Sequence, residues 1–530
     1  DFRPHYCRIV TLLNALPAHL PVLALTATAN QRVEQDIRQQ IGASALVVRG
    51  SMQRANLHLN VTQTHGDAEK LSYLAANVPM WPGSGLVYTG TQRSAEMVAA
   101  FLQQQGIEAE YYHAGREDSE RQSVEQGLMT NAYKVICSTN ALGMGIDKPD
   151  IRFVIHYHIP ASPIHYYQEI GRAGRDGKSA RCVLLYDPED LAIQQHFING
   201  AKPSIDQYEA VLVLVRNEAQ GWRFNDLMRI TGLPRNVLQN ILIDLEEQGF
   251  IQRLKLGGSA LYASHRLGRV DASFYEHIQQ VRTQKEQELA DIQNYAEQSR
   301  CSMGYLTAYL GDVVEQICGT CGNCGPQYWS KLPVSSQLEK AVTYFIERIF
   351  LPRLAKRGSI NRPEHEAGWA LSDHGSTRIG KLVRASKYEG AGPFPDELIV
   401  RAVEVVRTRY PIGELGGITS VPPTKSGSLV EDFARRVAKV LGLRYVSVLV
   451  KQRVTQEQKI CTNVVQKKEN VKGAFSVQKP EQIVGQSLLV IDDIYDSGYT
   501  LREVATTLRK AGAKAVYPLT ITKTMHSDDQ

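Results

Sequence analysis

What the sequence has little of excludes several classes of protein. Its 530 residues include only eight cysteines, four of them within residues 301–324, which argues against a disulfide framework and for one metal site in a reduced compartment. No apolar run approaches the roughly 18 residues of a membrane-spanning helix, and no signal peptide is recognisable. We therefore expect neither a membrane protein nor a secreted one.

The sequence also lacks a strong excess of either charge. The formal net charge is +5, so a basic surface for nucleic acid is permitted but not required. Apolar residues make up 43% and charged residues 22%, as in ordinary globular proteins, and the length suits roughly three to five domains. There is no initial Met: Asp1-Phe2-Arg3-Pro4 passes directly into a helical pattern, as if the chain began midway through a domain.

Strand and helix patterns alternate along the first 200 residues. Amphipathic segments between apolar runs predict crossover helices, and this alternation predicts a parallel sheet. The expected strands lie at 21–29, 45–48, 57–62, 85–88, 108–112, 134–138, 153–156 and 180–185. Ligands of such sheets bind where the strands end. Polar residues follow several of those ends: Thr89, Arg93, His113, Ser138 and Thr139.

A stretch rich in arginine and glycine, QEIGRAGRDG, occupies Gln168–Gly177. Arg172 and Arg175 are three residues apart, so on a helical turn both guanidinium groups would point the same way. The glycines let an anion approach the backbone closely. Paired cations with Gln168 nearby suit the γ-phosphate of a nucleotide, whose charge spreads as it leaves. A surface turn with two solvated arginines would explain the same residues.

Successive motifs in this region resemble those of superfamily 2 helicases, and more narrowly those of the RecQ family of DNA helicases. The motifs are ALTATA (24–29), YYHAGR (111–116), STNALGMGIDKPDIRFVIHY (138–157) and YYQEIGRAGRDG (166–177). The resemblance implies a RecA-like lobe that binds ATP with Mg²⁺. Arg172 and Arg175 would be its arginine fingers, and Gln168 their partner. Gly145 and Asp147 would contact the nucleotide. The resemblance also implies contacts with the DNA backbone from Arg93, Ser138 and Thr139.

The resemblance also exposes a gap. The first lobe of such a helicase carries a phosphate-binding GxxxxGK[ST] loop and an Asp-Glu pair, and neither occurs in this sequence. Gly177-Lys178-Ser179 is not such a loop, since Arg172 stands where the loop needs glycine. We therefore expect residues 1–41 to be the tail of a first lobe truncated at its amino end, and residues 42–200 to be the complete second lobe.

Residues 201–270 have the pattern of a winged helix. Three helical segments precede a hairpin with a Gly-Gly turn, and the third segment, opening at Pro234, is expected to be the second helix of a helix-turn-helix. Four residues at the start of that helix and on the hairpin are expected to meet DNA phosphates: Arg235, Asn236, Arg253 and Lys255. A winged helix that binds protein is the alternative.

A module at 271–330 is expected to hold a metal. A long polar helix is followed by four cysteines with 16, two and two residues between them, a pattern that suits four thiolates around tetrahedral Zn²⁺: Cys301, Cys318, Cys321 and Cys324. Buried unpaired cysteines are the alternative. A zinc module also belongs to the RecQ pattern, but in its better-known members zinc precedes the winged helix, whereas here it follows, as in a shorter bacterial branch.

Residues 331–410 are expected to form a separate helical and basic linker, and residues 411–530 a second α/β domain. In the latter an apolar strand at 487–491 runs into two carboxylates, Asp492 and Asp493, which can accept hydrogen bonds from ribose hydroxyls or approach Mg²⁺. The backbone N–H groups of 497–500, at the start of the next helix, can hold a phosphate. A plain strand–turn–helix is the alternative.

The segment LLVIDDIYDSGYT (488–500) resembles the PRPP-binding signature of type I phosphoribosyltransferases, and the domain looks closest to ComF-like proteins. The resemblance implies a site for PRPP with Mg²⁺, or for a nucleotide, in which Pro422–Gly427 is the pyrophosphate loop and 451–473 a hood. The implied ligand-binding residues are Asp492, Asp493, Asp496, Ser497, Gly498, Tyr499 and Thr500.

The sequence thus predicts an α/β multidomain protein: a RecA-like parallel-sheet helicase lobe, a winged helix, a four-cysteine zinc module and a type I phosphoribosyltransferase-like domain. By the resemblance it would unwind DNA 3′ to 5′ in repair or recombination, acting on single-stranded DNA and duplex junctions in the bacterial cytoplasm or nucleoid. The alternatives are a DNA-binding adaptor without catalysis and a phosphoribosyltransferase localised to DNA.

Overall fold

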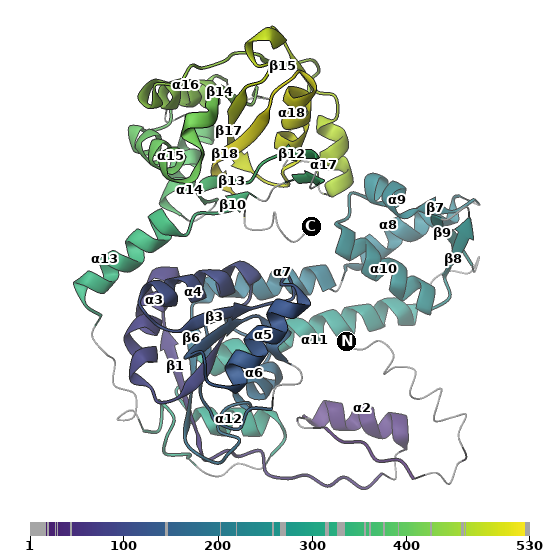
Figure 1. The fold of residues 1–530 in the computed structure, drawn as a ribbon. Coiled ribbons are helices and arrows are strands. Elements are labelled where there is room, and N and C mark those ends of the chain that lie inside the picture. The colour runs from purple at the N-terminus through teal and green to yellow at the C-terminus, as the bar shows by residue number, and fades with distance from the viewer. Residues whose placement is uncertain are drawn as a thin grey trace. The chain divides into compact units, whose positions relative to one another are not determined.

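The computed structural model describes residues 17, 21–26, 28, 30–42, 45–143, 147–201, 203–218, 220–256, 259–265, 272–312, 317–325, 334–354, 357–359, 362–374, 377–390, 392–423, 427–456, 461 and 463–524. The chain divides into two compact units (Figure 1), residues 1–199 with 280–345 and residues 200–279 with 346–530. Within the described residues, no helix has an apolar stretch long enough to cross a bilayer.

The first unit is built on a six-stranded sheet in the order β1-β6-β5-β2-β4-β3, and its paired strands are all parallel. The strands are β1 (Leu57–Gln63), β2 (Ser84–Tyr88), β3 (Ala109–Tyr112), β4 (Val135–Ser138), β5 (Ile151–His156) and β6 (Ala180–Tyr186). The intervening helices are α3 (Gly66–Asn77), α4 (Gln92–Gln104), α5 (Asp118–Met129), α6 (Pro163–Ile170) and α7 (Leu191–Ala201). The predicted parallel sheet with crossover helices is confirmed.

The register of this sheet places the carboxyl ends of its central strands side by side. Tyr88 at the end of β2 pairs with Ser138 of β4 on one side and with His156 of β5 on the other. Helices α4 and α6 then begin at fixed points, because Thr91 and Ser162 accept hydrogen bonds from backbone N–H groups of the first turns. The polar residues that follow these strands therefore share one edge.

Two of the expected strands are not strands in the structure. The described residues of 21–29, and all of 45–48, are irregular, and Leu23, Leu25, Leu46 and Val48 are each more than 80% exposed. An apolar strand is buried only beside a neighbour that takes up its hydrogen bonds, and no described strand pairs with either segment. The helix expected after residue 30 is present as α2 (Gln31–Ile41).

The zinc module shares the core of the helicase lobe. Helix α11 (Ala272–Glu297) is followed by α12 (Ser302–Tyr309), and α13 (Ser336–Tyr344) comes later in the chain. Tyr295, Leu306 and Cys321 are buried in the same hydrophobic cluster as Leu59 and Leu184 of the sheet. The cysteine-bearing segment is therefore anchored directly on β1 and its neighbours.

In the second unit, residues 205–264 form the predicted winged helix. Helices α8 (Ile205–Arg216), α9 (Phe224–Thr231) and α10 (Arg235–Glu247) pack on a small sheet of β7 (Trp222–Arg223), β8 (Ile251–Leu256) and β9 (Ser259–Ser264). Gly232 ends α9 with φ +73°, a left-handed conformation that glycine adopts without strain, and so sets the turn into α10.

The rest of the second unit is an α/β domain with a five-stranded sheet in the order β10-β13-β18-β17-β14. The strands are β10 (Arg353–Leu354), β13 (Gly368–Asp373), β14 (Leu415–Ser420), β17 (Ser487–Tyr495) and β18 (Ala515–Lys523). Its main helices are α14 (Arg378–Tyr388), α15 (Asp396–Arg409), α16 (Leu429–Leu441) and α18 (Tyr499–Lys510). Over the sheet lie β15 (Leu449–Lys451), α17 (Val464–Val471) and β16 (Phe475–Val477), with a small hairpin of β11 (Arg357–Ser359) and β12 (Arg362–His365) elsewhere in the domain.

The segment at 331–410 is not a separate linker. Strand β13 pairs in parallel with β18, and α15 packs its apolar face into the core that also holds α16 and β17. The buried Arg401 of α15 donates to the Leu371 carbonyl oxygen of β13 at 2.8 and 2.7 Å. The C-terminal domain therefore includes β13 and α15, which the signature motif alone does not identify as part of it.

Candidate functional sites

The carboxyl edge of the helicase sheet brings together the residues that we expected to meet DNA. The Thr89 N–H donates to the Ser138 carbonyl at 2.8 Å, and the Thr139 N–H donates to the Tyr112 carbonyl at 3.3 Å. Arg93 lies in the first turn of α4 and is half-buried, and Thr139 is partly exposed. Ser138 is fully buried and its hydroxyl donates to the Thr139 carbonyl, so the structure does not support it as a DNA contact.

A residue that the sequence did not single out fixes the turn before Arg93. His158 Nδ1 accepts a hydrogen bond from the Gly90 N–H at 2.9 Å. Burial lowers the pKa of His158 well below its ordinary value, so the ring is neutral and Nδ1 can accept. On its other side, Nε2 lies 4.0 Å from Asp190, whose carboxylate is paired with the buried Lys70 at 2.6 Å. The turn at Gly90 is thus held by a buried polar network of His158, Asp190 and Lys70.

The two arginines of the glycine-rich stretch do not lie on one helix. Helix α6 ends at Ile170 and the chain continues in turns, with Gly174 at φ +57°. Arg172 lies beside the buried Tyr88: burial raises the pKa of that phenol, and the charge of Arg172 opposes the rise. Arg175 is exposed, and its Nη1 lies 2.6 Å from Asp147 Oδ1.

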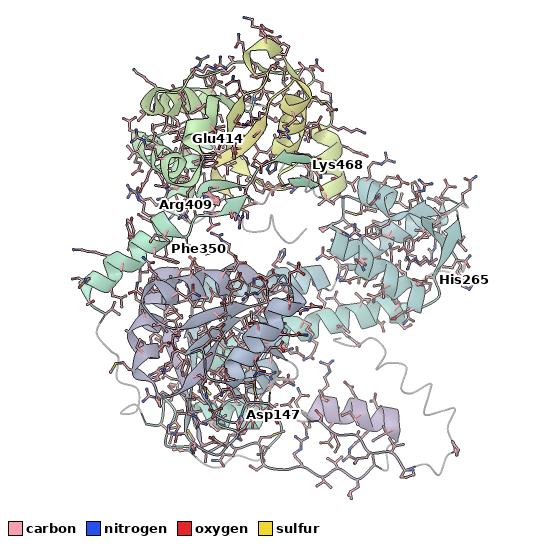
Figure 2. The ribbon with its side chains drawn as sticks, viewed as in Figure 1. Asp147, His265, Phe350, Arg409, Glu414 and Lys468 are labelled. Atoms are coloured by element: carbon pink, nitrogen blue, oxygen red, sulfur yellow. The ribbon has the colours of Figure 1, made fainter. Side chains whose placement is uncertain are left out.

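The loop that carries Asp147 was expected to bind nucleotide. The Asp147 side chain, labelled in Figure 2, is 86% exposed and is held by Arg175. Gly145 lies outside the described residues. Gln168 donates from Nε2 to Thr28 Oγ1 at 2.6 Å, so the ALTATA motif and the arginine-bearing motif meet in the structure.

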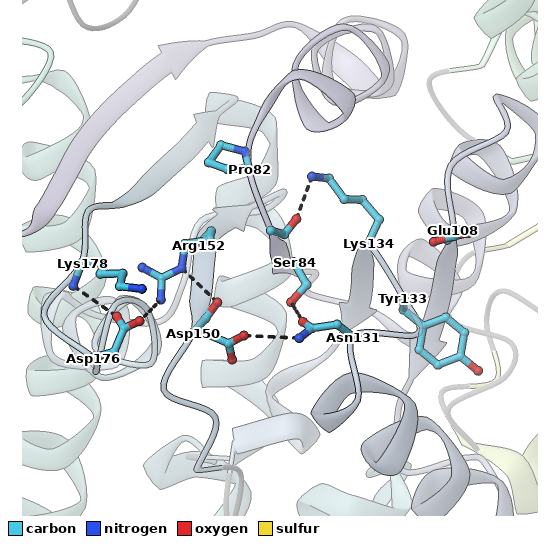
Figure 3. A pocket seen from close by; sticks show the side chains of 11 residues that line it. Pro82, Ser84, Glu108, Asn131, Tyr133, Lys134, Asp150, Arg152, Asp176 and Lys178 are labelled. Carbon is cyan, nitrogen blue, oxygen red and sulfur yellow. Dashed lines mark hydrogen bonds and ion pairs between the residues drawn. The ribbon is translucent and has the colours of Figure 1, made fainter.

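A cavity of the helicase lobe lies at the opposite edge of the sheet, where the strands begin (Figure 3). Ser84 opens β2, Lys134 immediately precedes β4, and Asp150 immediately precedes β5. Its volume is about 490 Å³, and some of its charged side chains already have partners: Arg152 pairs with Asp176 at 2.6 Å, and Lys134 Nζ donates to the Gly83 carbonyl at 2.7 Å. The cavity is separate from the expected DNA-contacting residues, and nothing in its chemistry selects a ligand.

The winged helix presents its expected contacts to solvent. Arg235 and Asn236 are exposed at the amino end of α10, and the Arg235 guanidinium lies 5.2 Å from the ring centre of Phe224, which fixes its direction. Arg253 is exposed on β8. The side chain of Lys255 lies outside the described part of the chain.

The four clustered cysteines are arranged so that they could hold a metal ion. Their Sγ atoms all lie within 4.8 Å of one another, and no other kind of ligand is needed to complete a tetrahedral Zn²⁺ site. Backbone N–H groups point at the sulfur atoms, from Ser302 to Cys321 at 3.4 Å and from Gly304 to Cys301 at 3.3 Å, as suits thiolates. Cys137, Cys182 and Cys461 are buried apart from the cluster, and Cys7 lies outside the described residues.

The signature of the C-terminal domain surrounds a cavity of about 650 Å³. Strand β17 extends beyond the predicted end at Ile491, so Asp492 and Asp493 lie on the strand itself. Gly498 precedes α18 with φ +76°, and a Cβ there would lie 2.4 Å from the Tyr495 hydroxyl, so only glycine fits. The backbone N–H groups from Ser497 to Thr500 thus gather at the helix start, where a phosphate binds well.

Three further parts of the domain line the same cavity. Pro422 and Pro423 come from the expected pyrophosphate loop, of which residues 424–426 lie outside the description, and Lys451 and Lys467 come from the expected hood. Lys467 of α17 pairs with Asp496 at 2.5 Å.

The sequence did not identify the remaining part, which comes from segment 331–410: His374, Lys387 and Tyr388. Lys387 Nζ lies 2.7 Å from Asp493 Oδ2. No local pattern in α14 could have revealed it, because the fold alone brings that helix to β17.

Four parts of the chain match known families. Family models match the helicase conserved C-terminal domain at residues 69–177, the IclR helix-turn-helix domain at 209–255, the RecQ zinc-binding domain at 265–325 and the phosphoribosyl transferase domain at 421–527. Each match falls on one of the sites described above.

Individual relatives cover less of the chain. The "Probable ATP-dependent DNA helicase RecS" of Bacillus subtilis is 38% identical over 226 residues, which are 42% of this chain and 45% of that protein. The "ATP-dependent DNA helicase RecQ" of Pasteurella multocida is 38% identical over 193 residues, 36% of this chain and 30% of that protein. This chain therefore spans less than half the length of either relative.

Among solved structures, S. cerevisiae Dbp5 bound to RNA and ADP BeF3 is 23% identical, with a TM-score of 0.32, and the match covers 37% of this chain and 54% of that one. The helicase and zinc-binding segments of this chain are thus similar to RecQ-type DNA helicases, and residues 421–527 match the phosphoribosyl transferase domain.

Proposed function

We propose that residues 42–200, with the zinc module at 271–330, act as the second motor lobe of an ATP-dependent DNA helicase. The observation that carries this proposal is the Arg175–Asp147 pair at the end of the glycine-rich motif. An exposed arginine held by a loop carboxylate is positioned to leave that partner for a nucleotide phosphate, whose negative charge is greater. The half-buried Arg172 instead supports the motif through Tyr88, and Gln168 ties it to Thr28.

ATP with Mg²⁺ would supply the phosphoryl group whose charge Arg175 stabilises. The Walker lysine and metal-binding carboxylates have to come from a first lobe, of which residues 1–41 are the proposed tail. Closing of the two lobes around ATP and their reopening after hydrolysis would move the protein along single-stranded DNA. We propose Arg93 and Thr139 as contacts with the DNA backbone.

The winged helix at 201–270 would bind DNA at the duplex junction. Arg235 and Asn236 open the second helix of the helix-turn-helix, which is the part of this fold that enters a DNA groove. Unwinding of DNA in repair or recombination, in the bacterial cytoplasm or nucleoid, follows from this assignment.

The test is Arg175→Ala in the full-length helicase, with Lys178→Ala as the matched control. Lys178 is an exposed cation three residues away that lies in the turn before β6, outside the Arg175–Asp147 pair. We expect Arg175→Ala to reduce DNA-stimulated ATP hydrolysis at least about 100-fold while DNA affinity changes less than about threefold. Lys178→Ala should retain both. Normal hydrolysis by the Arg175 variant would contradict the assignment.

We also propose that residues 346–530 bind a phosphoribosyl ligand such as PRPP. The observation in favour is one cavity that joins two ribose-compatible carboxylates, Asp492 and Asp493, with a helix amino end at Ser497–Thr500 suited to the 5-phosphate. Titration calorimetry of the full chain with PRPP tests the site, and Gly498→Val should abolish the binding because valine is strained at positive φ. Equal heats from both proteins would contradict it.

A further inference from the structure

The metal that the phosphoribosyltransferase resemblance implies does not fit the carboxylates of this chain. Mg²⁺ is bound in such sites through one or two carboxylates together with ligand phosphates. Here Asp493 Oδ2 already has a cation 2.7 Å away, the ammonium of Lys387, and the two side chains are only 19% and 11% exposed. A divalent ion at Asp493 would have to displace this ammonium or lie against it.

Lys387 is a fixed part of the fold and not a surface lysine that happens to reach the site. It lies in the last turn of α14, whose start is fixed by Thr377: the Thr377 hydroxyl accepts from the Gly380 N–H at 3.0 Å and donates to the Asp373 carbonyl at 2.7 Å. Helix α14 follows β13, which pairs with β18, which in turn pairs with β17. The sheet order therefore holds α14 close to the carboxylates of β17.

The fixed charges around the cavity balance without a metal. Lys387 is paired with Asp493 and Lys467 with Asp496, and Lys451 lines the same cavity as Asp492. Burial lowers the pKa of Lys387, but the Asp493 carboxylate raises it more, so the pKa lies above its ordinary value. This lysine is therefore charged. Two of the carboxylates are thus paired with ammonium groups, and burial together with the Asp493 charge raises the pKa of the third, Asp492, to about 7.

We infer that this domain binds a 5-phosphorylated ribose without a divalent cation, with the Lys387 ammonium in the position beside Asp493 that a metal would take. The inference rests on the proposed phosphoribosyl site and specifies its chemistry. The vicinal hydroxyls of ribose can donate to Asp492 and Asp493, and the ammonium can donate to the hydroxyl oxygen atoms. The phosphate is held by the amino end of α18, which needs no metal.

The experiment measures the affinity of the full chain for ribose 5-phosphate and for PRPP by titration calorimetry, once with EDTA and once with Mg²⁺. For the wild type we expect dissociation constants for ribose 5-phosphate that agree within about threefold in the two buffers, because Lys387 is always present. Lys387→Met keeps the length of the side chain and removes its charge. It should weaken binding in EDTA at least about tenfold, and Mg²⁺ should restore part of the loss.

Two further variants separate charge from folding. Lys387→Arg keeps the cation and should retain measurable binding in EDTA, whereas Lys381→Met, at an exposed position of the same helix, should behave as the wild type. Binding by the wild type only in Mg²⁺ would overturn the inference and leave the phosphoribosyl site standing. No binding of either ligand in either buffer would overturn the phosphoribosyl site and the inference with it.

Discussion

The buried ion pair between Lys70 and Asp190 should control the stability of the helicase lobe. Lys70 is 1% exposed on α3, and its Nζ lies 2.6 Å from Asp190 Oδ2. The pKa of Asp190 is raised to about 7: burial raises it most, Lys70 opposes the rise, and the nearby Asp187 and Asp67 add to it. Replacing Lys70 by methionine would remove the cation, so the buried Asp190 carboxyl would have to take up a proton or stay charged among other carboxylates.

The size of the effect follows from that imbalance. Removing one member of a buried ion pair costs about 3–5 kcal/mol, whereas replacing both members costs little. We therefore expect Lys70→Met to destabilise the lobe by about 3–5 kcal/mol and the double variant Lys70→Met/Asp190→Asn to recover at least about half of that loss.

The measurement should report on the lobe alone, because a chain of several domains does not unfold in one step. Native-state hydrogen exchange, followed by mass spectrometry on peptides from β1, α3 and β6, gives the opening free energy where the pair lies. A loss below about 1 kcal/mol in Lys70→Met would refute the claim that the pair is buried and energetically isolated. A double variant no more stable than the single one would assign the loss to packing instead of charge.

Other consequences of the structure can be measured in the same way. Cys321→Ser should release one Zn²⁺ per chain and lower the free energy of opening of α12, measured by hydrogen exchange, by at least about 3 kcal/mol. An unchanged zinc content by mass spectrometry would contradict a four-thiolate site. The pKa of His158 is lower in the folded protein than in the unfolded chain, so at low pH the unfolded chain binds a proton that the folded protein does not. Lowering the pH from 7.5 to 5.5 should therefore reduce the free energy of unfolding by about 1.4 kcal/mol through this group. This contribution to the pH dependence of the free energy of unfolding should disappear in His158→Asn. An unchanged pH dependence in that variant would show that the imidazole is protonated or exposed in the folded protein. Arg235→Ala should lower the dependence of log Kd on log salt by about one for duplex-junction DNA, while an unchanged slope would exclude a phosphate contact there.

Sequence patterns predicted those parts of the fold that local periodicity controls. Apolar runs of strand length predicted the six strands of the helicase sheet. The same reasoning was wrong for 21–29 and 45–48, where the runs look alike but lack a strand partner among the described residues. Periodicity indicates that a segment can be buried in a sheet, and only the rest of the fold supplies the neighbour that buries it.

The predicted geometry of Arg172 and Arg175 was wrong for a related reason. A spacing of three places two side chains on one face only while the helix continues. Helix α6 ends at Ile170, and Gly174 takes a left-handed conformation in which a Cβ would lie 2.6 Å from the Lys178 carbonyl oxygen. The glycines that were expected to admit an anion also end the helix, and the two arginines consequently lie in turns.

The position of Lys387 bears on which reaction class the C-terminal domain can serve. Transfer from PRPP expels pyrophosphate, and the negative charge that develops on this group has to be stabilised in the transition state, for which Mg²⁺ is well suited. Lys387 lies at Asp493, on the ribose side of the cavity, and its ammonium is already engaged there. It can hold a ribose, but it adds little to stabilising the leaving group. A domain that binds phosphoribosyl ligands through Lys387 without a metal is therefore better suited to detect such a ligand than to consume it. If so, PRPP should remain unchanged after prolonged incubation with the chain in EDTA.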